Sequence, residues 1–365
     1  MGASRDRDCE GDGGPAGPLT WGQASKGSRR LDFAVSVLDL VPILNGETAG
    51  DALRASVEVA RTAERFGYRR IWYAEHHNMA SIGSAATSVV IAHMAAHTSR
   101  IRLGAGGIML PNHSPLTIAE QFGTLEALHP GRIDLGLGRA PGSDRRTVFA
   151  LRRSDLSAER FPDDVVELQA YLAGHSRVPG VDAVPGRGSA VPLYILGSSL
   201  FGARLAASLG LPYAFASHFA PAALEPAVAL YREEFSPSEQ LQQPYVLAGV
   251  NVVCAHDDND ALDQFTQAKR NRVTAMFGKQ RPLSEEEVDA ILASPAGRHV
   301  EEMVTYSAVG TPKAVRAYVE SFARYSGADE LITVHQSPAH DARLASLELL
   351  AGALSLEAAA PLPGP

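Results

Sequence analysis

The sequence predicts a single (β/α)8 barrel of the TIM type, with an insertion after the seventh strand. Strand-like and helix-like segments alternate along residues 31–356, and the strand-like segments are almost continuously apolar. Burial on both faces of a parallel sheet requires such runs. Eight strand-then-helix units in a row close more naturally into a barrel than into an open sheet. A chain of 365 residues, 45% of them hydrophobic, is long enough for one such domain.

The units follow one another in a regular order. The expected strands are 32–41, 70–77, 101–110, 132–139, 193–199, 213–218, 245–255 and 330–336. The expected helices are 51–66, 84–97, 116–128, 163–172, 201–209, 222–235, a long helical region from the seventh strand to about 326, and 341–356. The first helix stops at Gly67, a residue type that commonly ends helices.

Three segments fall outside this alternation. Residues 1–30 are rich in glycine and charge and predict a disordered N-terminal arm, and residues 357–365 predict a flexible tail. Residues 278–310 interrupt the helical region after the seventh strand, on the face where barrel active sites form. A long insertion at that place is a candidate lid, which we expect to be mobile without ligand.

Composition and charge exclude several classes of partner. The net charge is −8 and the basic residues are not clustered, so neither nucleic acid nor an anionic membrane is expected as a partner. The chain has two cysteines, Cys9 and Cys254, which favours a reducing, cytoplasmic compartment over a disulfide. Ser28–Phe33 resembles a twin-arginine export signal, but Asp39 interrupts the apolar stretch behind it and no cleavage site follows.

Three polar residues, Glu75-His76-His77, lie where the second apolar strand ends. Groups at the carboxyl end of a barrel strand lie in the barrel mouth, where catalytic residues belong. Adjacent residues of a strand point to opposite faces, so both histidines can hardly bind one metal ion, and no metal site is expected. A single histidine with a pKa near ~6.5 suits general acid–base work, although a structural role remains open.

The third and fourth strands end in glycine-rich segments. Gly106 and Gly107 indicate either close approach of a ligand to the backbone or a simple bulge. The segment from Gly136 nearly mimics the dinucleotide fingerprint, but Pro141 takes the place of its last glycine. Arg139 is better interpreted as an anion ligand or as a rim salt bridge.

The fifth strand leads through Gly197-Ser198-Ser199 directly into a helix that contains Gly202. Free N–H groups and the positive end of the helix dipole at such a point suit a phosphate. An ordinary serine N-cap is the alternative. The nucleotide-binding P-loop, the serine-hydrolase elbow and the H-E-x-x-H zinc motif have no match in the sequence.

Taken together, these residues resemble the bacterial luciferase-like flavin monooxygenases over about residues 31–356. The matching segments, each at the expected strand end, are Ala74–His77, Gly104–Pro115, Gly131–Arg139, Ser198–Pro212 and Val309–Pro312. Luminescent members carry a reactive cysteine where this chain has Gly138, so light emission is not expected. The insertion 278–310 does not match theirs, and the substrate is therefore not implied.

The resemblance implies roles for individual residues. His76 corresponds to the active-site histidine, and Gly106-Gly107 fall where the family carries a cis peptide beneath the flavin ring. Arg139, Arg160 and Ser199, with the backbone near Gly202, fall where the family holds the FMN phosphate. The residues assigned to cofactor binding are Glu75, Gly106, Gly107, Arg139, Arg160, Ser198, Ser199 and Gly202.

The activity implied is that of a two-component monooxygenase. A separate flavin reductase supplies reduced FMN, O₂ is the co-substrate, and a small organic molecule is oxidised in a pocket from which water is excluded. Two alternatives stay open: hydride transfer with a deazaflavin coenzyme, and a flavin-sequestering protein without turnover.

A homodimer is expected from the helix at 84–97. Its apolar residues cover more of the circumference than one barrel can bury, so the helix needs a second partner. Together with the helix at 116–128 it forms a plausible two-fold contact, which the family commonly uses.

Overall fold

The computed structural model describes residues 31–140, 144–189, 191–278 and 281–358. The predicted arm 1–30, with Cys9 and the first half of the twin-arginine segment, lies outside the described residues, and so does most of the predicted tail 357–365. Among the described residues, no helix combines the length and apolarity needed to cross a lipid bilayer.

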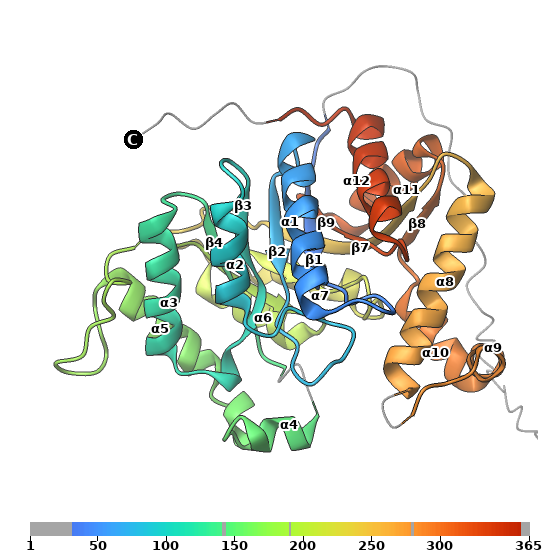
Figure 1. Cartoon of the computed structure of the whole chain (residues 1–365). Helices are drawn as coiled ribbons and strands as arrows, with labels where there is room; N and C mark the ends of the chain where they lie inside the picture. The colour runs from blue at the N-terminus through green and yellow to red at the C-terminus, as the bar shows by residue number, and fades with distance from the viewer. Residues whose placement is uncertain (1–30, 141–143, 190, 279–280, 359–365) are drawn as a thin grey trace, which may run out of the picture. The chain divides into compact units, whose positions relative to one another are not determined.

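Eight parallel strands close a ring, which confirms the predicted TIM barrel (Figure 1). The ring runs β1–β2–β3–β4–β5–β6–β7–β9 and closes through pairing of β9 with β1. Its strands are β1 (Ala34–Asp39), β2 (Arg70–Tyr73), β3 (Arg102–Met109), β4 (Ile133–Gly138), β5 (Leu193–Gly197), β6 (Tyr213–Phe215), β7 (Val246–Cys254) and β9 (Glu330–His335). Each lies within a segment expected from the sequence.

Helices connect successive strands of the ring. They are α1 (Ala49–Arg65), α2 (Thr87–Ala96), α3 (Pro115–Leu128), α4 (Arg145–Ala150), α5 (Phe161–Ala173), α6 (Leu200–Leu209), α7 (Leu224–Glu234), α8 (Asp258–Phe277), α9 (Glu285–Leu292), α10 (Pro295–Met303), α11 (Pro312–Ser326) and α12 (His340–Leu354). Short 3₁₀ turns lie at η1 (Leu110–Asn112) and η2 (Asp155–Ala158). In Figure 1, α4, α9 and α10 lie at the lower edge, the end at which the barrel strands finish.

The sequence did not predict a ninth strand, β8 (Ser307–Gly310), within the region expected to be helical up to about residue 326. It pairs in parallel with the second half of β7, from Asn251 opposite Ser307 to Cys254 opposite Gly310, and stays outside the ring. Its four residues are too few to show a hydrophobic pattern. β7 is long enough to complete the ring with its first half and to pair with β8 by its second.

The insertion 278–310 contains α9 and α10, which pack on the second half of α8. Val273 of α8, Val288 of α9 and Val300 of α10 form a small apolar cluster of their own. Ser284 caps α9 in a reciprocal arrangement with Glu287, in which each side chain accepts a backbone N–H at the other position. The candidate lid is therefore a helical pair with its own small core, followed by β8.

Two apolar layers hold the barrel together. The larger lies between the strands and the surrounding helices. The second fills the inside of the barrel and comprises Leu38, Trp72, Ala74, Tyr194, Ala214, Leu247, Ile332 and Val334. Because side chains fill the interior, a ligand can reach only the end at which the strands finish.

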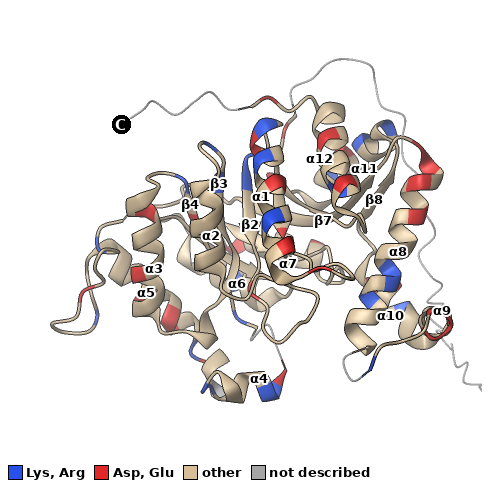
Figure 2. Cartoon of the chain, viewed as in Figure 1, with Lys and Arg blue, Asp and Glu red and all other residues tan. Residues whose placement is uncertain are grey.

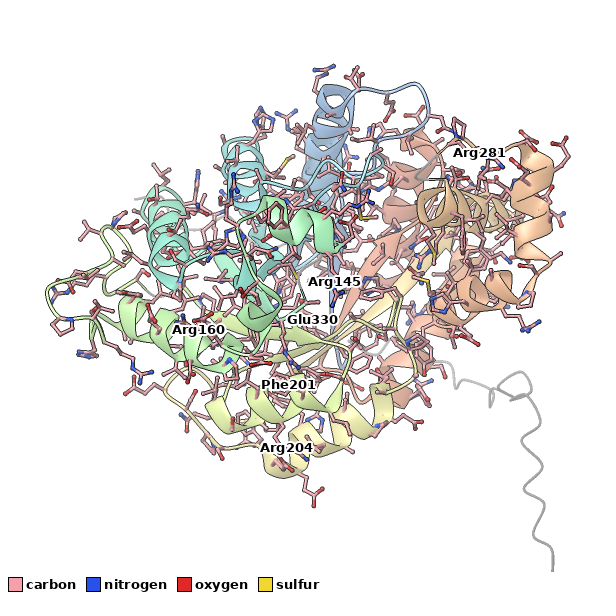
Figure 3. The ribbon with its side chains drawn as sticks, turned by 90° about the horizontal axis from the view of Figure 1, so that it is seen from below. Arg145, Arg160, Phe201, Arg204, Arg281 and Glu330 are labelled. Carbon is pink, nitrogen blue, oxygen red and sulfur yellow. The ribbon has the colours of Figure 1, made fainter. Side chains whose placement is uncertain are left out.

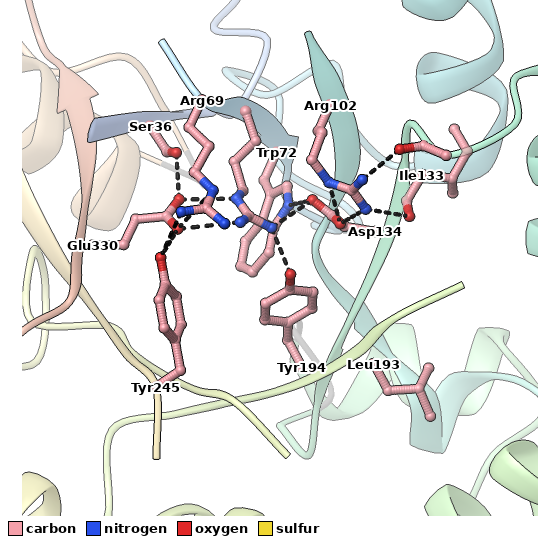
Figure 4. A network of polar contacts seen from close by, with 12 residues as sticks. Ser36, Arg69, Trp72, Arg102, Ile133, Asp134, Leu193, Tyr194, Tyr245 and Glu330 are labelled. Carbon is pink, nitrogen blue, oxygen red and sulfur yellow. Dashed lines mark hydrogen bonds and ion pairs between the residues drawn. The ribbon is translucent and has the colours of Figure 1, made fainter. Parts of the chain in front are cut away.

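A network of charges closes the opposite end, where the strands begin (Figure 4). Arg70, 1% exposed, lies between Asp134, 2.8 Å from its Nη1, and Glu330, 2.9 Å from its Nε. Tyr194 accepts a hydrogen bond from Arg70 at 2.6 Å, and Tyr245 donates one to Glu330 at 2.7 Å. Burial alone would lower the pKa of Arg70, but Glu330 and Asp134 raise it well above its ordinary value.

Candidate active site

The segment after β2 places its three polar side chains on two different sides. Glu75 and His77 lie on one side, where His77 Nε2 donates to Glu75 Oε1 over 2.9 Å. His76 does not join them, as the alternation of an extended chain requires. The described residues contain no group of three or more His, Cys, Asp or Glu side chains able to hold a metal ion.

Glu75 connects the end of β2 with the end of β3. Its side chain is 1% exposed and accepts the backbone N–H of Met109 at 2.9 Å and Nε2 of His113 at 2.9 Å. Burial would raise the pKa of this carboxyl, but hydrogen bonds from His113, Met109 and His77 outweigh it and leave the pKa below its ordinary value. The ionised carboxylate therefore fixes the geometry of the mouth at the end of these two strands.

His76 is the group at this point with unused hydrogen-bonding capacity. Its Nδ1 is buried and has no hydrogen-bond partner among the described residues. Burial lowers the pKa of His76, and the repulsion from His77 adds to this effect, while Glu75 opposes it. The imidazole is therefore neutral near pH 7 and can donate a hydrogen bond from one ring nitrogen and accept a proton at the other.

The glycines of β3 bring the backbone close to its neighbours. A Cβ on Gly106 would lie 2.9 Å from Leu38 Cδ1, and one on Gly107 would lie 2.7 Å from the carbonyl oxygen of Gly136. The peptide bond between Gly106 and Gly107 is cis, as the family resemblance implied. The pairing of β3 with β4 also shifts register between Ala105 and Ile108, so the expected irregularity of the strand is present.

The ends of β4 and β5 bring an arginine to the start of α6. The guanidinium of Arg139 lies 4.2 Å from the centre of the Phe201 ring, and its Nε donates to the carbonyl of Ala158 at 3.3 Å. Ser199 is the N-cap of α6, yet its side chain makes no capping hydrogen bond, contrary to the ordinary N-cap interpretation. Among the described residues, Arg139 pairs with no carboxylate and stays available for an anion.

Arg160 and Gly202 lie close to the same place. Pro162 at the start of α5 lines one groove with Phe201 and Arg204 of α6, and Figure 3 shows Arg160, Phe201 and Arg204 on this end of the molecule. Arg160 is exposed and forms an ion pair with Asp164 at 3.4 Å. Gly202 lies in the first turn of α6 next to Tyr213, and a Cβ there would make only ordinary contact with its ring, at 3.4 Å. Ser198 precedes this turn and is half-buried.

His218, after β6, was not singled out from the sequence. Its Nδ1 is buried without a partner among the described residues, and a Cβ on Gly249 would lie 2.3 Å from that atom. Asn251 Nδ2 donates to the carbonyl of His218 at 2.8 Å, and Gln336 Nε2 donates to Asn251 Oδ1 at 2.7 Å. The rule applied to β2, a polar residue directly after an apolar strand, would have found it.

Sequence comparisons agree with the motifs. A profile of the family described as luciferase-like monooxygenase matches residues 33–330. A luciferase-like monooxygenase of Escherichia coli K12 is 48% identical over 320 residues, 87% of this chain and 96% of that protein. N-acetyl-S-alkylcysteine monooxygenase of Bacillus subtilis is 41% identical over 194 residues, 50% of this chain and 56% of that protein.

Solved structures share the fold. Apo-MsnO8 superposes with a TM-score of 0.80 at 35% identity, covering 89% of this chain and 99% of that one. The oxygenating constituent of 3,6-diketocamphane monooxygenase from Pseudomonas putida, in complex with FMN, gives a TM-score of 0.66 at 16% identity over 87% and 96%. An F420-dependent secondary alcohol dehydrogenase gives 0.65 at 15% identity over 88% and 99%. Of these last two neighbours, the first holds FMN and the second an F420 adduct.

Proposed function

The chain belongs to the luciferase-like monooxygenase family of flavin-dependent oxidoreductases, and from this premise we propose that it is a two-component monooxygenase. A separate flavin reductase would supply reduced FMN. The enzyme would then insert one atom of O₂ into a small organic substrate and reduce the other to water. The observation that carries the proposal lies at the end where the barrel strands finish: among the described residues His76 Nδ1 is buried without a hydrogen-bond partner, Arg139 pairs with no carboxylate, and α6 begins without a side-chain cap.

The residues at α6 fit the phosphate of FMN. A phosphate dianion needs guanidinium groups and backbone N–H donors, and here Arg139 and the first turn of α6 offer both. Ser199 and Ser198 would add hydroxyl donors, and Gly202 would add a backbone N–H from the first turn of α6. Arg160 would join them by leaving its exposed ion pair with Asp164, which is a weak interaction.

The residues at β2 and β3 fit the reacting ring. Gly106 and Gly107 carry no side chain that would keep a planar ring away from the strand. His76 would hold or transfer a proton at the reacting atoms, since its neutral imidazole is the ionisable group with spare capacity there. Glu75 would contribute indirectly, because its carboxylate already holds the ends of β2 and β3. When bound, reduced FMN supplies the two electrons that O₂ activation requires.

The experiment that tests the proposal compares cofactors and follows the oxygen atom. The purified protein is titrated with reduced FMN and with a reduced deazaflavin without oxygen, and is then mixed with ¹⁸O₂ and candidate thioethers. N-acetyl-S-methylcysteine is the first probe, because the Bacillus subtilis relative carries the name of such a substrate. We expect tight binding of reduced FMN and one ¹⁸O atom in the product. Hydride transfer from the deazaflavin without ¹⁸O incorporation would instead establish the alternative activity.

A homodimer is part of the same proposal. Val89 on α2 is 67% exposed and Leu128 at the end of α3 is 64% exposed. Both are large apolar side chains on the helices expected to form the two-fold contact, and a second subunit would remove them from water.

A further inference from the structure

The imidazole of His218 lies inside the barrel. A Cβ on Gly249 would lie 2.3 Å from His218 Nδ1, so the ring occupies the space that a side chain at position 249 would take. Leu247, two residues earlier on β7, belongs to the apolar layer that fills the barrel. Ile332, which pairs with Gly249 across β7 and β9, belongs to the same layer. Side chains two residues apart on a strand point to the same face, so His218 lies above Leu247, at the end of the barrel where the strands finish.

Hydrogen bonds from two neighbouring strands fix the backbone at His218. Asn251, the next inward position on β7, is 0% exposed, and its Nδ2 donates to the carbonyl of His218 at 2.8 Å. Gln336, just after β9, donates from Nε2 to Asn251 Oδ1 at 2.7 Å. Ser217 donates from its hydroxyl to the carbonyl of Gly249 at 2.6 Å. These contacts connect the ends of β6, β7 and β9 and fix the segment that carries the imidazole.

Two atoms of this group keep unused hydrogen-bonding capacity. Among the described residues, neither His218 Nε2 nor Gln336 Oε1 forms a hydrogen bond, and neither atom is fully buried. Both polar atoms of the Asn251 side chain are used. Burial is the largest of the causes that lower the pKa of His218 to about 3, so its imidazole is neutral at pH 7 and can donate or accept. The three side chains carry no charge, and β7 contains no Lys, Arg, Asp or Glu (Figure 2).

The opposite side of the mouth carries the residues proposed for the flavin ring. In the ring of eight strands, β6 lies four strands from β2, and β7 lies four strands from β3. His76 follows Trp72 and Ala74 of the interior layer at intervals of two residues, so it points inward from the end of β2. The interior of an eight-stranded barrel is just wide enough for side chains to fill, so His76 and His218 border one space from opposite strands. A flavin ring against β3 would therefore leave the side of β6 and β7 for the substrate.

We propose that His218 contacts the organic substrate and, together with Gln336, binds a neutral hydrogen-bonding group on it, such as an amide. The proposal deepens the proposed function and rests on it, because it takes the bound molecule to be the monooxygenase substrate. An amide both donates and accepts hydrogen bonds, which matches the free imidazole nitrogen and the free amide oxygen. A carboxylate has no proton to donate to Gln336 Oε1, and it would lose its water without gaining a charged partner from His218, Asn251 or Gln336.

The test uses two neutral probes of similar length, hexanamide and methyl pentyl sulfide, of which only the first has an amide. Their binding is measured by NMR titration of the full chain with saturating FMN. His218→Ala should weaken hexanamide binding about three- to tenfold, the loss expected for one neutral hydrogen bond. The same substitution should not weaken binding of the sulfide. His218→Gln should retain part of the hexanamide affinity, because its amide can still form a hydrogen bond.

Gly249→Ala tests the position of the ring without removing it. The added Cβ would displace the imidazole, so this variant should bind hexanamide as weakly as His218→Ala does. In the His218→Ala background the same change should cause no further loss, because the ring is then absent. Gly352→Ala on α12 is the control for an added methyl group, since no described atom lies within 4 Å of its Cβ. It should bind both probes as the wild type does.

Four outcomes would overturn the inference or part of it. An equal loss for the two probes in His218→Ala, or no loss for either, would show that His218 forms no hydrogen bond to the ligand. Tighter binding of hexanoate than of hexanamide by the wild type would reject a neutral group. A further loss when Gly249→Ala is added to His218→Ala would show that Gly249 does not act through the ring. A loss of reduced-FMN affinity in His218→Ala as large as the loss for hexanamide would assign His218 to the flavin instead. A wild type that binds hexanamide through His218 but binds no flavin would remove the proposed function and keep the amide site.

Discussion

The two ends of the barrel treat their polar groups in opposite ways. Where the strands begin, each carboxylate of the central network has a partner: Asp134 contacts Arg70 and Arg102, and Glu330 contacts Arg70 and Tyr245 (Figure 4). Where the strands finish, His76 and His218 each keep a buried ring nitrogen without a partner among the described residues.

This difference separates stability from function within one fold. A buried polar atom without a partner destabilises the protein by about 1–3 kcal/mol, and a ligand that satisfies such an atom recovers part of this energy. In the network at the strand starts, Arg70, Asp134 and Glu330 each have a charged partner without any ligand, so this network can contribute to the fold alone. At the mouth, by contrast, buried ring nitrogens of His76 and His218 have no partner among the described residues unless a ligand binds. Substitutions at the first end should therefore change stability, and substitutions at the second should change binding or turnover.

The largest expected effect is at the mouth. His76→Ala should reduce product formation by about 10²–10⁴, the usual range for a lost general acid–base group, and leave reduced-FMN affinity within a few-fold. Because His76 Nδ1 has no partner to lose, the free energy of unfolding should not fall. Single-turnover product yield at saturating reduced FMN measures the first effect and urea denaturation the second. His93→Ala, an exposed histidine on α2, is the control. Near-normal yield from His76→Ala would show a structural histidine.

The opposite pattern is expected where the strands begin. Arg70→Met removes the guanidinium between Asp134 and Glu330 and leaves two buried carboxylates without it, which should destabilise the protein by about 3–5 kcal/mol. Arg69→Met is the matched control, because Arg69 is half-exposed and 3.8 Å from Glu330, and such a pair contributes at most about 1 kcal/mol. Denaturation curves of the two variants measure the loss in free energy of unfolding. Equal loss in the two variants would mean that the buried network is not what stabilises this end.

A smaller effect is expected at the proposed phosphate site. Arg139→Ala should weaken reduced-FMN binding roughly ten- to a hundredfold, since a contact between charged groups contributes ~1.5–3 kcal/mol. The loss should shrink for riboflavin, which has no phosphate. Arg204→Ala is the control, since this arginine lines a groove with Phe201 on α6 and already pairs with Glu234 at 3.2 Å. Fluorescence titration of each flavin provides the affinities, and an equal loss for both flavins would contradict the phosphate assignment.

The sequence alone predicted the structural features that depend on residues close together in the chain. The apolar runs defined the ring strands, polar residues at their ends marked His76 and Arg139, and glycines within the third strand marked Gly106 and Gly107. The cis bond between these glycines was implied by the family resemblance. β8 was missed because four residues carry no pattern and its pairing depends on the length of β7.

Contacts between distant residues could not be predicted. Arg70 and Glu330 are separated by 260 positions, and no local feature marks either as part of one network. Glu75 was assigned to the cofactor by resemblance, whereas its contacts in the fold are with His77, Met109 and His113.

The smallest effect on stability and on flavin binding is expected from a substitution on the outer helices of the barrel. Val89 is a large apolar side chain of α2, 67% exposed, and belongs neither to the network nor to the mouth. Val89→Glu should convert the proposed homodimer to a monomer, because a charge in an apolar two-fold contact faces its own copy. Unfolding free energy of the subunit should change by no more than about 0.5 kcal/mol, and reduced-FMN affinity should not change. Light scattering at micromolar concentration measures the mass. A wild type that is already monomeric would reject the dimer, and a monomeric variant that also loses flavin binding would show that the mouth depends on the second subunit.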